Sequence, residues 1–244
     1  MAQNSGPMDQ FIVKPLINLD MAGIDISYTN SALLMTFAVL STFLLFWMAT
    51  RKRTLVPTRW QSVGELIYEF TASMVKDNVG KEGMRYFPFI FTLFMFVFFG
   101  NVLGLMPYSF TFTSHLFVNG VLAVFIFVAV TIIGFWHHKL HYLRMFCPEG
   151  TPIAVAIVLV PIEIMSYCIR PVTLSLRLFA NMLAGHVLLK VLAGFIISMG
   201  LMLGWIPFLA LIAITLLEIL VALIQTYVFA LLATIYLNDA INMH

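Results

Sequence analysis

The sequence has 244 residues, of which 61% are apolar and 10% charged, and its formal net charge is +2. With a mean hydropathy of +1.00, it carries more apolar side chain than the interior of a soluble domain of this length holds, so it predicts a polytopic membrane protein. The small net charge and scattered basic residues give no basis for nucleic-acid binding.

The N-terminal segment, residues 1–30, is polar and acidic. It has no basic stretch followed directly by an apolar run, so we expect it to be retained and not cleaved as a signal. Apolar runs of membrane-spanning length follow at 31–50, 86–107, 116–136, 151–195 and 203–238. The stretch "GFIISMGLMLGW" separates the last two runs. We therefore expect one all-α membrane domain with five spanning helices, the last two forming a long tilted antiparallel hairpin.

Residues 54–80, between the first two spans, form an amphipathic segment. Its apolar side chains recur at helical spacings of 3, 1, 3 and 4 residues: Val63, Leu66, Ile67, Phe70 and Met74. This pattern predicts a helix that lies at the membrane interface or packs on the bundle.

The basic residues predict the orientation of the chain. Nine lie in the segments 51–85 and 137–150, and the opposite side has one, Lys14. The nine are Arg51, Lys52, Arg53, Arg59, Lys76, Lys81, Arg85, Lys139 and Arg144. Because basic loops stay on the cytoplasmic side, we expect the N-terminus outside and the C-terminus inside.

The two cysteines, Cys147 and Cys168, lie 21 residues apart with no CxxC pattern or nearby histidine pair. We read them as small buried apolar residues and expect no disulfide framework, metal site or cofactor. No GxxxxGK[ST] motif is present, so nucleotide binding is not expected in this chain.

The stretch "SLRLFANMLAGH" in the fourth span contains Arg177, Asn181 and His186. An arginine cannot be deprotonated in a protein, and placing one in the middle of a membrane costs roughly 3 kcal/mol. A partner group or an aqueous cavity must therefore meet Arg177. Pairing with a carboxylate of the same chain is the structural alternative.

An antiparallel hairpin turning near residue 201 places polar residues of its two helices at equal depths. The matched residues are Arg177 with Gln225, His186 with Glu218, and Glu163 with Asp239. On the first of these helices, Glu163, Arg170 and Arg177 are seven residues apart and lie within roughly 40° of one stripe.

This order places a titratable group on each side of a permanent cation, which favours ion translocation, because Glu and His exchange protons and Arg does not. For Glu163 and Asp239, extension of the side chain to the interface is an alternative, and Arg170 and Lys190 are also candidates for this or for binding lipid head groups. A secondary transporter is the rival function, weakly favoured by Pro161 and Pro171.

The stretches "PVTLSLRLFANMLAGH" and "LLEILVALIQTYVFALLATIYLNDA" resemble subunit a of F-type ATP synthases, and the likeness covers nearly the whole chain, including "LGLMP" at 103–107. The resemblance implies that Arg177 is the essential arginine that meets a c-ring carboxylate and separates two half-channels. It implies polar supporting roles for Asn181 and Gln225.

For the remaining positions, the resemblance implies that His186 and Glu218 act together in the outer half-channel and that Glu163 serves the inner one. Many bacterial members exchange the acid and the imidazole of the outer pair, whereas mitochondrial members match this chain. Asp239, Arg170 and Lys190 stay minor candidates.

The implied partners are the c-ring, the b-type subunits of the peripheral stalk, the rest of the ATP synthase complex and the lipid bilayer. The implied location is the bacterial inner membrane, or the mitochondrial inner membrane as the alternative. The chain itself is expected to catalyse no bond chemistry.

Overall fold

The computed structural model describes residues 13, 15–18, 20–21, 24–25, 27–51, 57–106, 110–139, 142 and 153–242. Within these ranges the helices are α1 (Asn30–Arg51), α2 (Arg59–Val79), α3 (Phe87–Gly104), α4 (Leu116–His138), α5 (Ile153–Leu203) and α6 (Trp205–Ile241), with short 3-10 helices η2 (Glu82–Tyr86) and η3 (Phe112–Ser114). Lys14, Lys52, Arg53, Arg144 and Cys147, and Pro107 of the "LGLMP" stretch, lie outside the described residues.

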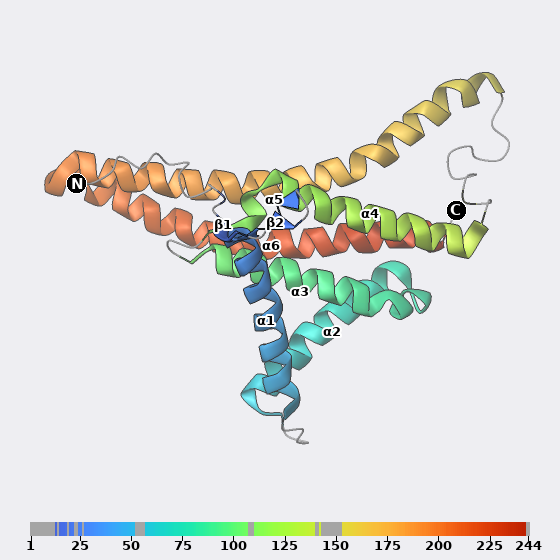
Figure 1. The fold of residues 1–244 in the computed structure, drawn as a ribbon, viewed down its shortest axis with the longest axis horizontal. Helices are drawn as coiled ribbons and strands as arrows, with labels where there is room; N and C mark the ends of the chain where they lie inside the picture. Colours follow the sequence, from blue (N-terminus) through green and yellow to red (C-terminus); the bar gives the residue numbers. More distant parts are fainter. Residues whose placement is uncertain are drawn as a thin grey trace.

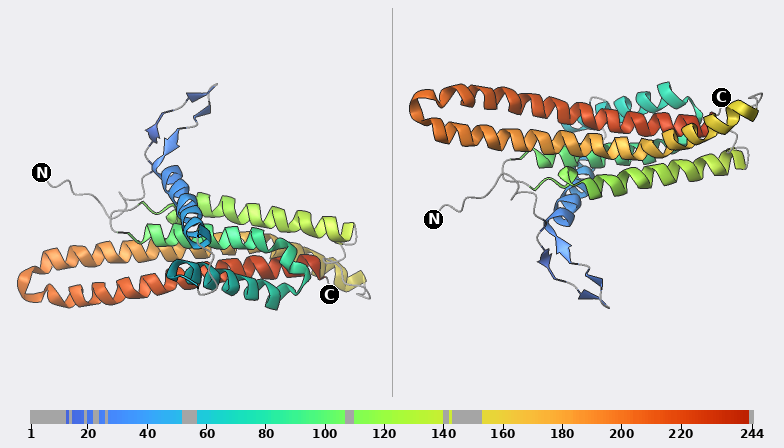
Figure 2. Two further views of the ribbon diagram at one scale, coloured as in Figure 1. Left: turned by 90° about the horizontal axis from the view of Figure 1, so that it is seen from below. Right: turned by 90° about the horizontal axis from the view of Figure 1, so that it is seen from above.

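Four short strands precede α1, in a segment where the sequence analysis predicts no strand. They are β1 (Pro15–Ile17), β2 (Asp20–Met21), β3 (Ile24–Asp25) and β4 (Tyr28–Thr29). β1 pairs antiparallel with β4, and β2 pairs antiparallel with β3. Figure 2 shows these strands projecting beyond the end of α1, away from the other helices.

Five helical segments are long and apolar enough to cross a membrane by length and composition. They are Asn30–Arg51, Glu82–Gly104, Leu116–His138, Val155–Gly200 and Trp205–Ile241. The predicted all-α integral membrane protein is therefore confirmed. α2 is absent from this set, in agreement with its amphipathic pattern.

α2 begins at a capped end, where the hydroxyl of Thr58 accepts a hydrogen bond from the backbone amide of Gln61. Its second half packs into the core through Met74, Val75 and Val79, whereas Trp60 and Leu66 stay exposed. A Cβ on Gly64 would lie 2.8 Å from Cβ of Ala49, so a glycine is needed where α2 crosses α1. The helix thus joins the bundle by one face and leaves apolar residues on the other.

α5 and α6 form the long hairpin that dominates the molecule (Figure 1). α5 spans 51 residues, about 75 Å at 1.5 Å per residue and more than twice the roughly 30 Å of a bilayer core, so an inclined hairpin fits a membrane better than an upright one. In Figure 1, α1 runs steeply across the direction of both helices.

The turn of the hairpin is built on glycines. Gly200 has a φ of 64°, which favours glycine, and the amide of Gly204 donates a hydrogen bond to the carbonyl of Gly200 at 2.9 Å. α5 continues beyond residue 195, where the sequence analysis ends it, as far as the turn at Gly200. An apolar segment in lipid keeps its backbone hydrogen bonds within the helix.

Pro161 and Pro171 lie inside α5, and the helix continues through both. Each proline removes a backbone hydrogen bond, which bends a helix. Figure 1 shows the N-terminal part of α5 curving away from α6. The two helices therefore pair closely near the turn and diverge towards the other end.

α6 packs against α2, α3, α4 and α5, and a series of small residues allows this close approach. Ala222, Ala230, Ala233 and Ala240 are each almost completely buried. Leu174 and Leu178 of α5 belong to the same buried core as these alanines of α6.

Candidate functional site

The hairpin brings His186 and Glu218 to the same depth, as the sequence register predicts. Gly185 of α5 lies directly against the side chain of Glu218 on α6, and a Cβ at position 185 would collide with the Glu218 carboxylate. His186 is the next residue along α5. The glycine therefore makes room for the acid beside the histidine.

Glu218 and Gln225 lie two turns apart on α6 and are both buried, with 6% and 7% of their surface exposed. Neither Glu218 Oε1 nor Gln225 Nε2 finds a hydrogen-bond partner among the described residues. Buried polar atoms of this kind are rare in native proteins and point to a functional demand or to a further partner.

Arg177 is exposed, although it lies on an apolar helix. It forms no ion pair with any described residue of the chain. The described part of the chain therefore does not show the alternative role, in which Arg177 pairs with a carboxylate of the same chain. Its neighbours Leu176 and Val172 are also exposed, whereas Leu174 and Leu178 are buried. α5 thus presents a cation without an ion-pair partner among the described residues on an outward apolar face.

Seven residues from the contact of Gly185 with Glu218, the antiparallel helices reach Leu178 and Gln225. Arg177 therefore lies within about one residue's rise, 1.5 Å, of the depth of Gln225. Asn181 is half-buried one turn from Arg177 towards His186. The predicted level of Arg177 agrees with this register.

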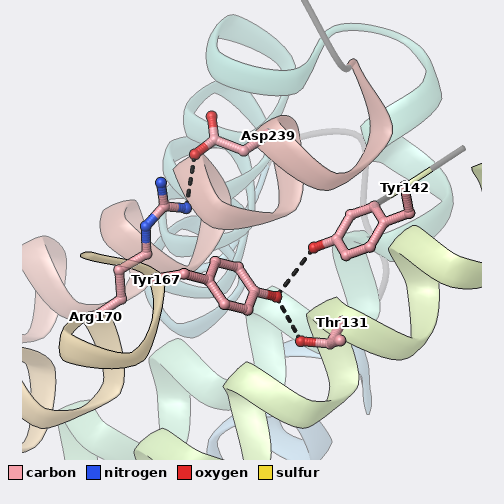
Figure 3. Close-up of polar contacts among 5 residues, drawn as sticks. All are labelled: Thr131, Tyr142, Tyr167, Arg170 and Asp239. Atoms are coloured by element: carbon pink, nitrogen blue, oxygen red, sulfur yellow. Dashed lines mark hydrogen bonds and ion pairs between the residues drawn. The ribbon is translucent and has the colours of Figure 1, made fainter. Parts of the chain in front are cut away.

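Asp239 is paired with Arg170, which lies seven residues along α5 from Glu163, the residue that the sequence register matched to it in depth. Its carboxylate forms an ion pair with Arg170 at 3.0 Å, whereas equal depth had placed it opposite Glu163 (Figure 3). α5 contains Pro161 and Pro171, and its N-terminal part curves away from α6 (Figure 1), so a depth counted along two straight helices does not extend to Glu163. The guanidinium also lies over the rings of Tyr167 and Tyr236.

Beside this ion pair, a directed chain of hydroxyl groups joins α4 and α5 (Figure 3). Thr131 donates to the carbonyl of Phe127, so it accepts from Tyr167, which in turn accepts from Tyr142. Burial and the neighbouring Tyr167 raise the pKa of Tyr142 above its usual range, so this hydroxyl keeps its proton. The N-terminal part of α5 is thereby fastened to α4 by Tyr167 and to α6 by Arg170.

At the depth of His186, the loop between α3 and α4 reaches the hairpin. Oγ1 of Thr111 lies 2.9 Å from Nε2 of His186. His115, just before α4, stacks on Phe110, and burial lowers the pKa of His115 below its usual value. Polar groups from two parts of the chain thus meet at the depth of Glu218.

α3 contributes a further polar contact near the level of Gln225. Nδ2 of Asn101 donates to Oγ1 of Thr226 at 3.1 Å and to the carbonyl of Ala222 at 3.4 Å. Its Oδ1 has no partner within the described ranges. An asparagine inside the apolar run "FFGNVLG" was a signal for this contact that the sequence reasoning did not use.

The sequence analysis also does not identify Thr111 and Gly185 as site residues. A threonine in a loop carries no distinctive pattern, and Gly185 is recognisable only once its contact with Glu218 is known. Glu163 and Lys190 are both half-buried on α5. Neither contacts Arg177 in the part of the chain that the structure describes.

The arrangement is suited to proton transfer. It combines an acid and an imidazole at one depth, a permanent cation exposed at another, and further carboxylates towards the opposite end. Within the described ranges, no group of three or more His, Cys, Asp or Glu side chains is placed to hold a metal ion.

Comparison with known proteins gives a consistent family. The profile described as "ATP synthase A chain" matches residues 32–238. The "ATP synthase subunit a" of Rhodospirillum rubrum is 58% identical over 98% of this chain and 99% of the relative. Those of Paramagnetospirillum magneticum and Pelagibacter ubique are 52% and 50% identical, covering 98% and 100% of this chain and the whole of each relative. The chain belongs to the ATP synthase subunit a family.

Proposed function

We propose that this chain is the stator subunit that conducts protons to and from the rotating c-ring of an F-type ATP synthase, and so couples proton flow to ATP synthesis or hydrolysis. The observation that carries the proposal is Arg177, an exposed cation on an apolar face with no ion-pair partner among the described residues. An unpaired charge in a membrane needs a partner, and a carboxylate on a neighbouring ring supplies one.

In this proposal, Arg177 separates two half-channels. It attracts each ring carboxylate that has lost its proton, and it repels a proton that would pass directly from one side to the other. Asn181 and Gln225 lie near its depth and hold the polar surroundings in which a carboxylate approaches and leaves.

The outer half-channel passes His186 and Glu218, and the inner one passes Glu163. Asp239 lies beside the inner path, where Arg170 holds its carboxylate. Lys190 lies one turn beyond His186, and we assign it no proton transfer of its own. A proton thus reaches the ring past the outer pair and leaves past the inner acid after nearly a full rotation.

The proposed partners are the c-ring, the b-type subunits of the peripheral stalk and the remaining ATP synthase subunits. The proposed location is the bacterial inner membrane, with the N-terminus outside and the C-terminus in the cytoplasm.

A cysteine cross-linking experiment tests the contact with the ring. Leu176→Cys places a thiol on the exposed face next to Arg177, and we expect it to form disulfides with cysteines introduced along the outer helices of the ring. Ser175→Cys is the matched control, because this nearly isosteric change lies on the buried side. Equal cross-linking from both positions, or none from Leu176→Cys in an assembled complex, contradicts the proposed interface.

Impermeant thiol reagents test the orientation. In a chain whose native Cys147 and Cys168 are replaced by serine, Lys81→Cys should react only from the cytoplasmic face, because the basic segments stay inside. Leu16→Cys, exposed in β1, should react only from outside. Labelling of Lys81→Cys from outside would reverse the assignment of the two half-channels.

A further inference from the structure

Thr111 makes two hydrogen bonds, one to the backbone at the end of α3 and one to the imidazole of His186. Its Oγ1 donates to the backbone carbonyl of Gly104 at 3.2 Å and lies 2.9 Å from Nε2 of His186. The residue itself is almost completely buried. The loop after α3 therefore presents one oriented hydroxyl to the histidine.

The number of protons decides the direction of the second bond. A threonine hydroxyl carries a single proton, and in Thr111 that proton goes to the Gly104 carbonyl. The hydroxyl oxygen then accepts from His186, so Nε2 carries the ring proton. In the neutral ring the acceptor nitrogen is consequently Nδ1.

The position of Thr111 is itself tightly determined. A Cβ on Gly104 would lie 2.6 Å from Cγ2 and 3.1 Å from Oγ1 of Thr111, so the close approach requires a glycine at the end of α3. Oγ of Ser114 also donates to the backbone carbonyl of Thr111 at 2.5 Å. A hydroxyl held in this way orients its partner more sharply than a mobile side chain does.

We infer that Thr111 is a positioning residue that fixes the tautomer and ring orientation of His186, so that Nδ1 is the nitrogen that takes up and releases the transferred proton. This inference rests on the proposed function for the role of His186 in proton flow. Thr111 does not transfer the proton, because its hydroxyl is engaged with the Gly104 carbonyl.

Substitutions at Thr111 in the assembled complex test the role. Thr111→Val keeps the shape and removes the hydroxyl, and we expect ATP-driven proton pumping to fall about tenfold, since misplacement of a reacting group by an ångström costs up to about a hundredfold. Thr111→Ser keeps the hydroxyl and should retain most of the rate. Thr113→Val is the control, because it makes the same change two residues away, where Oγ1 has no partner in the described part.

The tautomer is read directly by solid-state NMR of the complex with nitrogen-isotope-labelled histidine. His186 is assigned as the signal lost in His186→Gln. We expect the Nε2-protonated form in the unmodified chain and in Thr111→Ser, and a population protonated on Nδ1 in Thr111→Val. An unchanged tautomer in Thr111→Val, or equal losses of pumping in Thr111→Val and Thr113→Val, overturns the inference.

The two measurements also separate this inference from the proposed function. If His186→Gln pumps normally, the proposed role of His186 in the outer path fails, and the tautomer signal still decides whether Thr111 sets the ring. If His186→Gln loses pumping and the tautomer is independent of Thr111, the proposed function stands and the positioning role falls.

Discussion

Arg177→Ala is expected to abolish ATP synthesis and ATP-driven proton pumping while the complex still assembles. Arg177 is exposed and contributes little to the packing of the hairpin, whose core is formed by neighbours such as Leu174 and Leu178. The substitution therefore removes a charge directed at a partner and leaves the fold intact.

The same variant should let protons leak. Without the cation, nothing repels a proton passing from one half-channel to the other, so membranes stripped of the catalytic sector should show passive proton permeability. Arg177→Lys should keep much of the block because its charge remains. It should still lose coupling, because an ammonium lacks the planar guanidinium that holds a carboxylate through two donors.

Arg170→Ala is the matched control on the same helix. It removes an arginine whose charge is paired with Asp239, and both side chains are partly exposed, at 26% and 38%, so we expect a loss of at most about 1 kcal/mol of stability. This variant should pump more slowly without a proton leak. Near-normal coupled pumping in Arg177→Ala, or a leak of the same size in Arg170→Ala, would contradict the role given to Arg177.

Removing either His186 or Glu218 should slow proton flow by roughly a hundredfold, the lower end of what a positioned proton-transfer group contributes. His186→Leu and Glu218→Gln each take one titratable group from the same depth of the hairpin. Because the two groups act together, the double variant should be scarcely slower than either single variant. ATP-driven proton uptake in membrane vesicles measures all three.

Exchange of the two groups is the more demanding form of this test. His186→Glu combined with Glu218→His keeps an acid and an imidazole at one depth, and we expect it to recover part of the flow that each single variant loses. Glu65→Gln, an exposed carboxylate on α2, is the control and should leave the flow unchanged. Additive losses in the double variant, with no recovery on exchange, would show that His186 and Glu218 work independently.

The sequence by itself determined the class of protein, the spanning segments and most of the polar positions. The lengths of the apolar runs and the turn-forming glycines near residue 200 suffice for this. Lipid offers no hydrogen-bond partners to the backbone, so a spanning segment of this kind forms a helix. The depth of His186 beside Glu218 also followed from counting, since two regular helices joined by a short turn rise at the same rate. That regularity holds only where the helices run straight.

The tertiary structure decided which arginine is paired. Arg170 and Arg177 are equivalent in type and lie on one stripe of α5, yet Arg170 finds Asp239 and Arg177 meets no carboxylate among the described residues. The bend of α5 at its prolines sets this difference, and its direction depends on packing against α4 and α6. The hydroxyl of Thr111 also reaches His186 only through the fold of the loop, across a sequence separation that no local pattern spans.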